Sequence, residues 1–133
     1  MTMSIGTLDE EAWRLSEPGT PHPRRRLEAL ARLRDVDIDV AVLMAPVLPG
    51  LSDDPRQIEE VRQACAEAGV AVSGPTRLHL RSPALRAHYL DWLGEAAPEA
   101  VAATERSVSV PPPKRRRRAN RRPAHDGQLQ LGV

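Results

Sequence analysis

The stretch Ile38–Asp54, IDVAVLMAPVLPGLSDD, decides the fold that this sequence predicts. Its first part, Ile38–Met44, is almost continuously apolar, as is typical of a parallel strand that is covered on both faces. The loop Ala45–Asp53 is rich in proline and glycine, which favours a reversal of the chain. Asp54 and Pro55 then suit the N-cap and the first position of a helix. The stretch therefore predicts one strand–loop–helix unit.

Similar signals flank this unit on both sides. Further strands are expected at Met1–Ile5, Val70–Ser73 and Arg77–Leu80, and further helices after a Thr7-x-x-Glu10 capping box, near Thr20–Pro23 and at Ser82–Pro83. Alternating strands and helices imply a parallel sheet with right-handed crossovers. Three or four strands do not close a barrel, and an open sheet leaves unpaired edges. The sequence therefore predicts an α/β fold that is part of a larger structure.

Composition limits what this fold contains. The chain has 133 residues, no phenylalanine, and only three aromatic side chains of the Tyr and Trp types, Trp13, Tyr89 and Trp92. Its core is therefore expected to consist of Leu, Val, Ile and Ala. Cys65 is the only cysteine, so intrachain disulfides and multi-cysteine metal sites are excluded. We expect this thiol to be buried on the apolar face of a helix that ends at Gly69.

Charge divides the chain into two parts. Residues 1–113 carry 12 basic and 17 acidic side chains, a net charge of −5, whereas residues 114–133 carry 7 and 1, a net charge of +6. We expect a folded domain over residues 1–97 and a disordered Pro/Arg-rich tail over residues 98–133. No apolar run approaches the roughly 20 residues that span a bilayer, and the N-terminal residues lack the pattern of a signal peptide, so we expect no membrane contact and a cytoplasmic location.

Four segments carry a resemblance to a known family. They are TLDEEAWRLSEPGTPHPRRRLEALARL (7–33), IDVAVLMAPVLPGLSDD (38–54), IEEVRQACAEAGV (58–70) and LHLRSPALRAHYLDWL (78–93). Together they resemble the C-terminal half of radical S-adenosylmethionine (SAM) proteins related to spore photoproduct lyase, over roughly residues 3–94. The E-P-x-T-P turn before an R-x-x-x-L helix and the A-P-x-L-P-G-x-x-D loop are specific in combination. The resemblance implies a partial, half TIM-like barrel with parallel strands and crossover helices.

The same resemblance implies a chemistry that this chain does not complete. Members of the family hold a 4Fe-4S cluster through a CxxxCxxC motif and cleave SAM reductively to a 5′-deoxyadenosyl radical. That motif is absent here, so no catalytic or metal-ligating residue is expected. The implied function is an enzyme fragment that is inactive alone, retains part of the SAM-binding face, and has a separate cluster-bearing half as its partner. By position after the strands, Ser4 would contact the ribose or methionine part, and Ala45 and Pro46 the adenine.

Other candidate residues have simpler interpretations. We interpret His22 as a surface position at a helix start, His79 as a half-buried histidine with its hydrogen bonds satisfied, and Glu17 as a carboxylate that only makes turn hydrogen bonds. His88 and His125 show no metal-ligand spacing with His79. The loop Ala45–Asp53 lacks the glycines and lysine of a phosphate-binding loop.

Two alternative functions remain open from the sequence. The basic run Lys114–Arg122, KRRRRANRR, would bind nucleic acid by neutralising phosphates, although no aromatic residues interleave it for base stacking. The chain would then be a small nucleic-acid-binding protein. The other alternative is a non-catalytic interaction module that pairs through an exposed edge of its sheet and forms a stoichiometric dimer.

Overall fold

The computed structural model describes residues 1–108. Its elements in chain order are β1 (Thr2–Ser4), α1 (Glu10–Ser16), α2 (Pro23–Arg34), β2 (Ala41–Leu43), α3 (Pro55–Ala68), β3 (Ala71–Val72), α4 (Pro83–Ala96), the 3₁₀ turn η1 (Pro98–Ala100) and α5 (Val101–Ser107). The strands form one parallel sheet in the order β1-β2-β3. The expected parallel α/β class is therefore confirmed. Within this described part, no helix has the length and apolar character needed to cross a bilayer.

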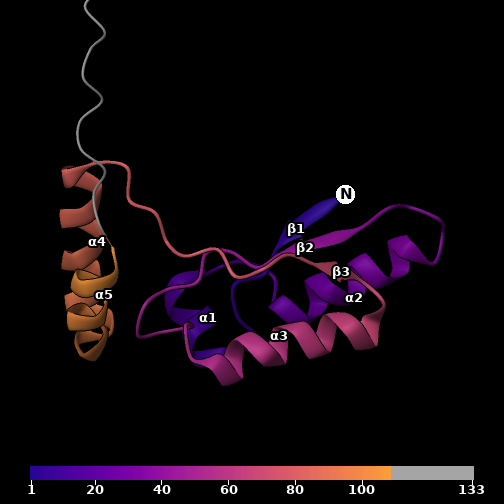
Figure 1. Cartoon of the computed structure of the whole chain (residues 1–133), viewed down its shortest axis with the longest axis horizontal. Helices are drawn as coiled ribbons and strands as arrows, with labels where there is room; N and C mark the ends of the chain where they lie inside the picture. The colour runs from indigo at the N-terminus through magenta and orange to yellow at the C-terminus, as the bar shows by residue number, and fades with distance from the viewer. Residues whose placement is uncertain (109–133) are drawn as a thin grey trace, which may run out of the picture.

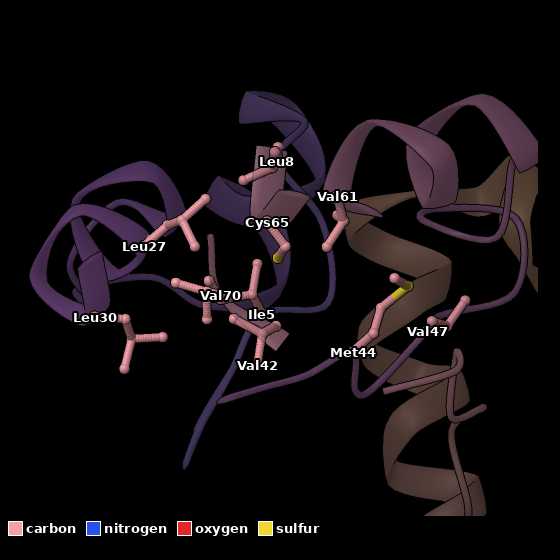
Figure 2. Close-up of a cluster of buried hydrophobic side chains, with 10 residues drawn as sticks. All are labelled: Ile5, Leu8, Leu27, Leu30, Val42, Met44, Val47, Val61, Cys65 and Val70. Atoms are coloured by element: carbon pink, nitrogen blue, oxygen red, sulfur yellow. The ribbon is translucent and has the colours of Figure 1, made fainter. Parts of the chain in front are cut away.

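One face of the sheet is buried against two helices. Figure 1 shows α2 and α3 side by side on the same side of the strands. The core between these layers contains Ile5, Leu30, Val42, Val61 and Cys65, each at most 1% exposed. Figure 2 shows these side chains converging with their neighbours in the cluster. Aliphatic packing without aromatic rings thus forms the main core, as the composition predicts.

The opposite face of the sheet is uncovered by residues 1–108. The parallel register pairs Thr2 with Ala41 and Ser4 with Leu43, and side chains paired in this way point to the same face. Ser4 is exposed and Leu43 is 39% exposed, whereas Val42 between them in the register is 1% exposed. All-parallel sheets usually have both faces covered. The expectation that Ile38–Met44 is buried on both sides is therefore wrong for the described chain, because α2 and α3 cover only one.

Helix ends follow the sequence signals in most places. Asp54 Oδ1 accepts a hydrogen bond of 2.7 Å from the Arg56 N–H, and Gly69 ends α3 in the left-handed conformation with φ of 65°. Ser82 caps α4 as expected, through a 3.2 Å bond from the Leu85 N–H. These caps stabilise the helices because each satisfies or terminates free backbone groups.

The capping box predicted at Thr7 is wrong. Asp9 is the N-cap of α1, and its Oδ1 accepts from the Ala12 N–H at 2.8 Å. Thr7 is buried and serves a different purpose: its hydroxyl donates to Gln57 Oε1 at 3.1 Å and accepts from the Asp9 N–H at 3.0 Å. This bond to α3 is a tertiary contact, which a local capping pattern does not reveal.

The strand predicted over Arg77–Leu80 is also wrong. Arg77 makes only an isolated parallel bridge with Val47, and Leu78 N–H donates to the Val47 carbonyl at 3.0 Å. The ladder stops there because the partner chain turns away: Leu51 and Ser52 N–H both bond to the Leu48 carbonyl. An alternating pattern gives a strand only where a straight partner lies beside it.

The domain boundary expected after residue 97 is wrong as well. Residues 98–107 form η1 and α5, which pack on α4, and Ala100, Thr104 and Val108 are at most 5% exposed. Gly50 allows this approach, because a Cβ there would lie 2.9 Å from the Ala100 Cα. Small residues such as Ala100 and Thr104 pack closely without giving the sequence a strong periodic apolar pattern. The sequence analysis therefore did not predict α5. The rest of the predicted tail, including Lys114–Arg122, lies outside the described residues.

Candidate functional site

A cavity of about 480 Å³ lies at the carboxyl ends of the strands. Its first wall consists of residues that follow β1 and β2 together with the end of α1, and its second wall consists of α4 and the segment that leads into it. The lining residues are Gly6, Thr7, Leu15, Ser16, Glu17, Pro18, Pro46, Leu48, Ser52, Leu78, Leu80, Leu85, His88, Tyr89 and Trp92. Ligands of parallel α/β folds bind at this end of the strands, where loops from several strands meet. The volume also falls in the usual range for small-molecule sites.

The first wall depends on a close contact between the two strand ends. A Cβ at Gly6 would lie 2.5 Å from the Pro46 carbonyl oxygen, so only glycine fits there. Beyond Pro46, which follows a cis peptide bond, the Leu48 N–H donates to the Ser52 hydroxyl at 2.8 Å. These contacts hold the loop after β2 in a compact form beside the end of β1.

An ion pair supports the same wall from α1 and α2. Arg26 Nη2 lies 2.8 Å from Glu17 Oε2, and Arg26 Nη1 donates to the Ser4 carbonyl at 2.9 Å. The Arg26 side chain is only 14% exposed. Glu17 therefore does more than make turn hydrogen bonds, and that interpretation is wrong. Arg26 of α2 thereby joins Glu17, at the end of α1, to Ser4, at the end of β1.

The second wall is aromatic. Tyr89 and Trp92, one turn apart on α4, have ring centroids 5.4 Å apart at 45°. The Tyr89 hydroxyl is buried and has no hydrogen-bond partner among the described residues. Burial raises the pKa of Tyr89 to about 12, so the group is a neutral hydrogen-bond donor at physiological pH. The hydroxyl oxygen has less than 1 Å² of accessible surface, so it is closed off from the cavity although Tyr89 is one of the lining residues.

Most other polar groups of the lining are already engaged. The Thr7 hydroxyl bonds to Gln57, the Ser16 hydroxyl donates to the Ala12 carbonyl at 2.6 Å, and Ser52 bonds to Leu48. No lysine or arginine is among the lining residues. The cavity therefore has a largely apolar and aromatic surface without a lysine or arginine, and the exposed His88 is among its polar side chains.

The three residues predicted to contact SAM do not lie together in this cavity. Pro46 lines the cavity. Ala45, the residue before Pro46, is not among the lining residues, and its N–H donates to the Leu43 carbonyl at 2.9 Å. Ser4 is exposed at the carboxyl end of β1, on the uncovered face of the sheet. The structure thus places all three at the carboxyl ends of β1 and β2 but on different surfaces.

The histidines and the cysteine have clear positions. His22 caps α2, with Nδ1 accepting from the Arg24 N–H at 3.1 Å, and its ring packs edge-on against Trp13 at 4.8 Å. His79 is exposed, so the half-buried interpretation is wrong. Cys65 is fully buried as predicted, and burial raises the pKa of its thiol. His125 lies outside the described residues.

Sequence reasoning missed the role of α4. Leu85, Tyr89, Trp92 and Leu93 all lie on α4, and only Leu93 is fully buried. The first three line the cavity, together with the exposed His88. Tyr and Trp residues are rare in this chain, and two of the three, Tyr89 and Trp92, lie one helical turn apart. This spacing was the available sequence signal for an aromatic surface on α4. In residues 1–108 there is no group of three or more His, Cys, Asp or Glu that could hold a metal ion.

Comparison with known proteins yields relatives but no family. No family model matches the chain, and no solved structure matches it. An uncharacterized protein of Mycobacterium tuberculosis and one of Mycobacterium bovis are each 35% identical to it over 101 residues, which is 76% of this chain and 29% of the relative. An uncharacterized protein of Acidianus two-tailed virus is 32% identical over 84 residues, 61% of this chain and 28% of that protein. The chain therefore spans less than a third of the length of the curated relatives it matches.

Proposed function

We propose that this chain is the C-terminal half of a radical SAM barrel, inactive alone, which supplies part of a SAM-binding face to a separate cluster-bearing half. The observation that carries the proposal is the one-sided parallel sheet. In a closed α/β barrel the helices cover only the outside of the strands, and the other face lines the interior. The uncovered face of β1 and β2, with Ser4 and Leu43, has the position of such an interior.

The position of the cavity supports the same proposal. It lies at the carboxyl ends of the strands, where barrel enzymes place their sites, and Pro46 is one of its lining residues. The relatives also support it, because the matched region is only 29% of the mycobacterial proteins. A segment of this kind therefore occurs within a longer polypeptide in those relatives.

The iron–sulfur cluster does not fit the residues of this chain. Cluster ligation needs several thiolates, and Cys65 is the only cysteine and is fully buried in the core. Burial raises the pKa of this thiol, which opposes the thiolate form that a metal requires. The proposal therefore assigns the cluster and the reductive chemistry to the partner half.

SAM fits the chain only in part. The Ser4 hydroxyl is free to bond to the ribose or methionine part from the uncovered face, and Ala45 and Pro46 offer backbone and apolar contacts to the adenine. The Ser4 carbonyl is already held by Arg26, which fixes the backbone at this point. These residues bind and orient a nucleoside; none of them is placed to move a proton or an electron.

Isothermal calorimetry of SAM with the full chain tests the proposal. We expect weak binding, in the high micromolar range, which falls when Ser4 is replaced in Ser4→Ala. Thr2→Ala is the matched control, because Thr2 is exposed on the same face two residues earlier in β1. Folded protein that does not bind SAM, with circular dichroism as the test of folding, would contradict the retained SAM face.

The basic run Lys114–Arg122 favours a second candidate function. This segment lies outside the described residues, so the support is its charge alone. Phosphate contacts by these side chains would make affinity for DNA or RNA fall steeply with salt. Deletion of residues 114–122 should abolish binding in an electrophoretic mobility assay. Binding that is insensitive to salt, or that survives the deletion, would exclude this function.

A third candidate is an interaction module that pairs through the edge of β1 or β3. Both strands are edges in the sheet of residues 1–108, with unpaired backbone groups. Light scattering should then show a stable dimer, while heterogeneous aggregates would count against it.

A further inference from the structure

We propose that the open hollow between α1 and the first turn of α2 binds an aromatic compound that carries one anionic group, with its ring on Trp13 and its anion on Arg25. The hollow has a volume of about 690 Å³, within the usual range for small-molecule sites. It shares no lining residue with the cavity at the strand ends, and Ser4, Ala45 and Pro46 lie outside it. This site therefore goes beyond the proposed function and does not depend on SAM.

Trp13 forms a fixed aromatic wall of the hollow. Its indole N–H donates to the Thr20 hydroxyl at 3.0 Å, and that hydroxyl donates to the Glu17 carbonyl at 2.8 Å. The His22 ring packs edge-on against the indole, with ring centroids 4.8 Å apart at 67°. These contacts bury Trp13 only in part, and it remains one of the lining residues. A ring compound that stacks on such a wall gains apolar burial without the cost of ordering the side chain.

Arg25 brings an unpaired positive charge to the same hollow. It makes no ion pair with any residue of 1–108, whereas Arg24, Arg26 and Arg34 of the same helix each pair with a carboxylate. Glu28, one turn further along α2, is not among the lining residues and forms no ion pair with Arg25 within that range. A free guanidinium beside an aromatic surface suits a ligand in which a ring carries a carboxylate or a phosphate.

The other charged and titratable groups of the hollow leave this charge uncompensated. Glu10 and Arg14, one turn apart on α1, form an ion pair and cancel each other. His22 Nδ1 accepts from the Arg24 N–H, so the neutral ring carries its proton on Nε2. Nε2 has no partner within residues 1–108 and is open to solvent, which makes it a further donor to an anion. The hollow thus has a net charge of one positive unit, and protonation of His22 would add a second, so it favours an anionic ligand.

Two-dimensional ¹H–¹⁵N NMR of the full chain tests the proposal, because each of its two tryptophans gives a separate indole N–H signal. The Trp92→Phe variant assigns the Trp13 signal. Trp92 lines the strand-end cavity, so its signal reports binding there separately.

The probes share one ring system and differ in charge. They are 1-naphthoate and 1-naphthyl phosphate, which are anions, and 1-naphthamide, which has nearly the outline of the carboxylate without its charge. We expect the Trp13 signal to shift saturably, with the tighter anion bound about three- to fivefold more strongly than 1-naphthamide. Tighter binding of the naphthoate would assign a carboxylic acid as the ligand, and tighter binding of the phosphate would assign a phosphate ester.

Arg25→Gln separates the anion contact from ring binding. This variant should bind the three probes with similar affinity, because it removes the unpaired charge and leaves Trp13 in place. Arg32→Gln is the matched control and should keep the preference for anions. Arg32 is exposed two turns further along α2, has no ion pair within residues 1–108, and lies outside the hollow.

Three results would overturn the proposal. They are equal affinity for the anions and 1-naphthamide in the unchanged chain, a preference for anions that Arg25→Gln keeps or that Arg32→Gln loses equally, and the absence of a saturable shift of the Trp13 signal. The probes are compared within each variant, so a change in its stability does not alter the comparison. SAM calorimetry with Ser4→Ala reports on a different surface, so failure of the SAM-binding face is distinguishable from failure of this site.

Discussion

Glu17 Oε2 lies 2.8 Å from Arg26 Nη2, and this ion pair joins the end of α1 to α2 beside the end of β1. The side chains are 27% and 14% exposed, so water screens the pair only partly. Arg26 also donates to the Ser4 carbonyl. The pair therefore helps to position one wall of the cavity.

Glu17→Gln should lower the free energy of unfolding by about 1.5 to 3 kcal/mol, because the Arg26 charge loses a charged partner in a largely buried place. Glu10→Gln is the matched control. Glu10 pairs with Arg14 on the surface, with side chains 61% and 70% exposed, and its loss should cost below about 0.5 kcal/mol. Urea denaturation of both variants measures the difference, and equal costs would show that the Glu17 pair is no better than a surface pair.

Neighbouring residues of β2 test the one-sided sheet. Val42→Ala should cost about 2 kcal/mol, because Val42 is 1% exposed in the core against α2 and α3. Leu43→Ala should cost less than about 1 kcal/mol, although it removes more atoms, because Leu43 is 39% exposed. The loss of stability in each of the two variants is measured as a lowered midpoint of thermal unfolding. A larger cost at Leu43 would mean that something covers the second face in solution.

The titration of Tyr89 is directly observable, because it is the only tyrosine of the chain. Tyrosinate absorbance of the folded protein should have its midpoint near the raised pKa of about 12, and near the ordinary value of 10 in urea. The unfolded state therefore releases its proton first. The stabilising contribution of the neutral side chain is complete below pH 10 and is lost as the pH rises from 10 to 12. A native midpoint near 10 would show that the hydroxyl is open to water.

Glycine substitutions test the contact between the loop after β2 and η1. Gly50→Ala should cost at least about 2 kcal/mol, since φ is +73° and the new Cβ would lie 2.9 Å from Ala100. Gly19→Ala has a similar φ of +80° with open space around it, and should cost about 1 kcal/mol. Gly94→Ala, inside α4 with nothing near, should stabilise the protein by about 0.5 to 1 kcal/mol. Similar costs at Gly50 and Gly19 would argue against close packing of η1.

Thiol labelling tests the burial of Cys65. We expect the native protein to react with a thiol reagent only as fast as it opens, because the side chain is fully buried and burial raises the pKa of its thiol. Labelling in urea should be complete at once. Since the unfolded thiol ionises first, stability should fall as the pH rises above the ordinary thiol pKa. Fast labelling of folded protein would place Cys65 at the surface.

Several features of this protein follow from its sequence alone. The apolar run at Ile38–Met44 marked the central strand, and Asp54, Ser82 and Gly69 marked helix ends that the structure confirms. These signals are local: a cap or a terminating glycine acts on backbone groups within one turn. The parallel order of the strands follows as well, because crossover helices leave few other arrangements.

Tertiary structure alone decided the rest. Thr7 has the pattern of a cap but bonds to Gln57, fifty residues away, and Arg77–Leu80 has the pattern of a strand but lacks a straight partner. The cavity forms because α4 returns to the carboxyl ends of the strands, which brings Tyr89 into the same lining as Gly6 and Pro46. Such contacts depend on long-range packing, and the residues that make them carry no common local pattern. Local sequence signals determined most of the elements and their order, whereas packing determined which face of the sheet stayed open and where the cavity formed.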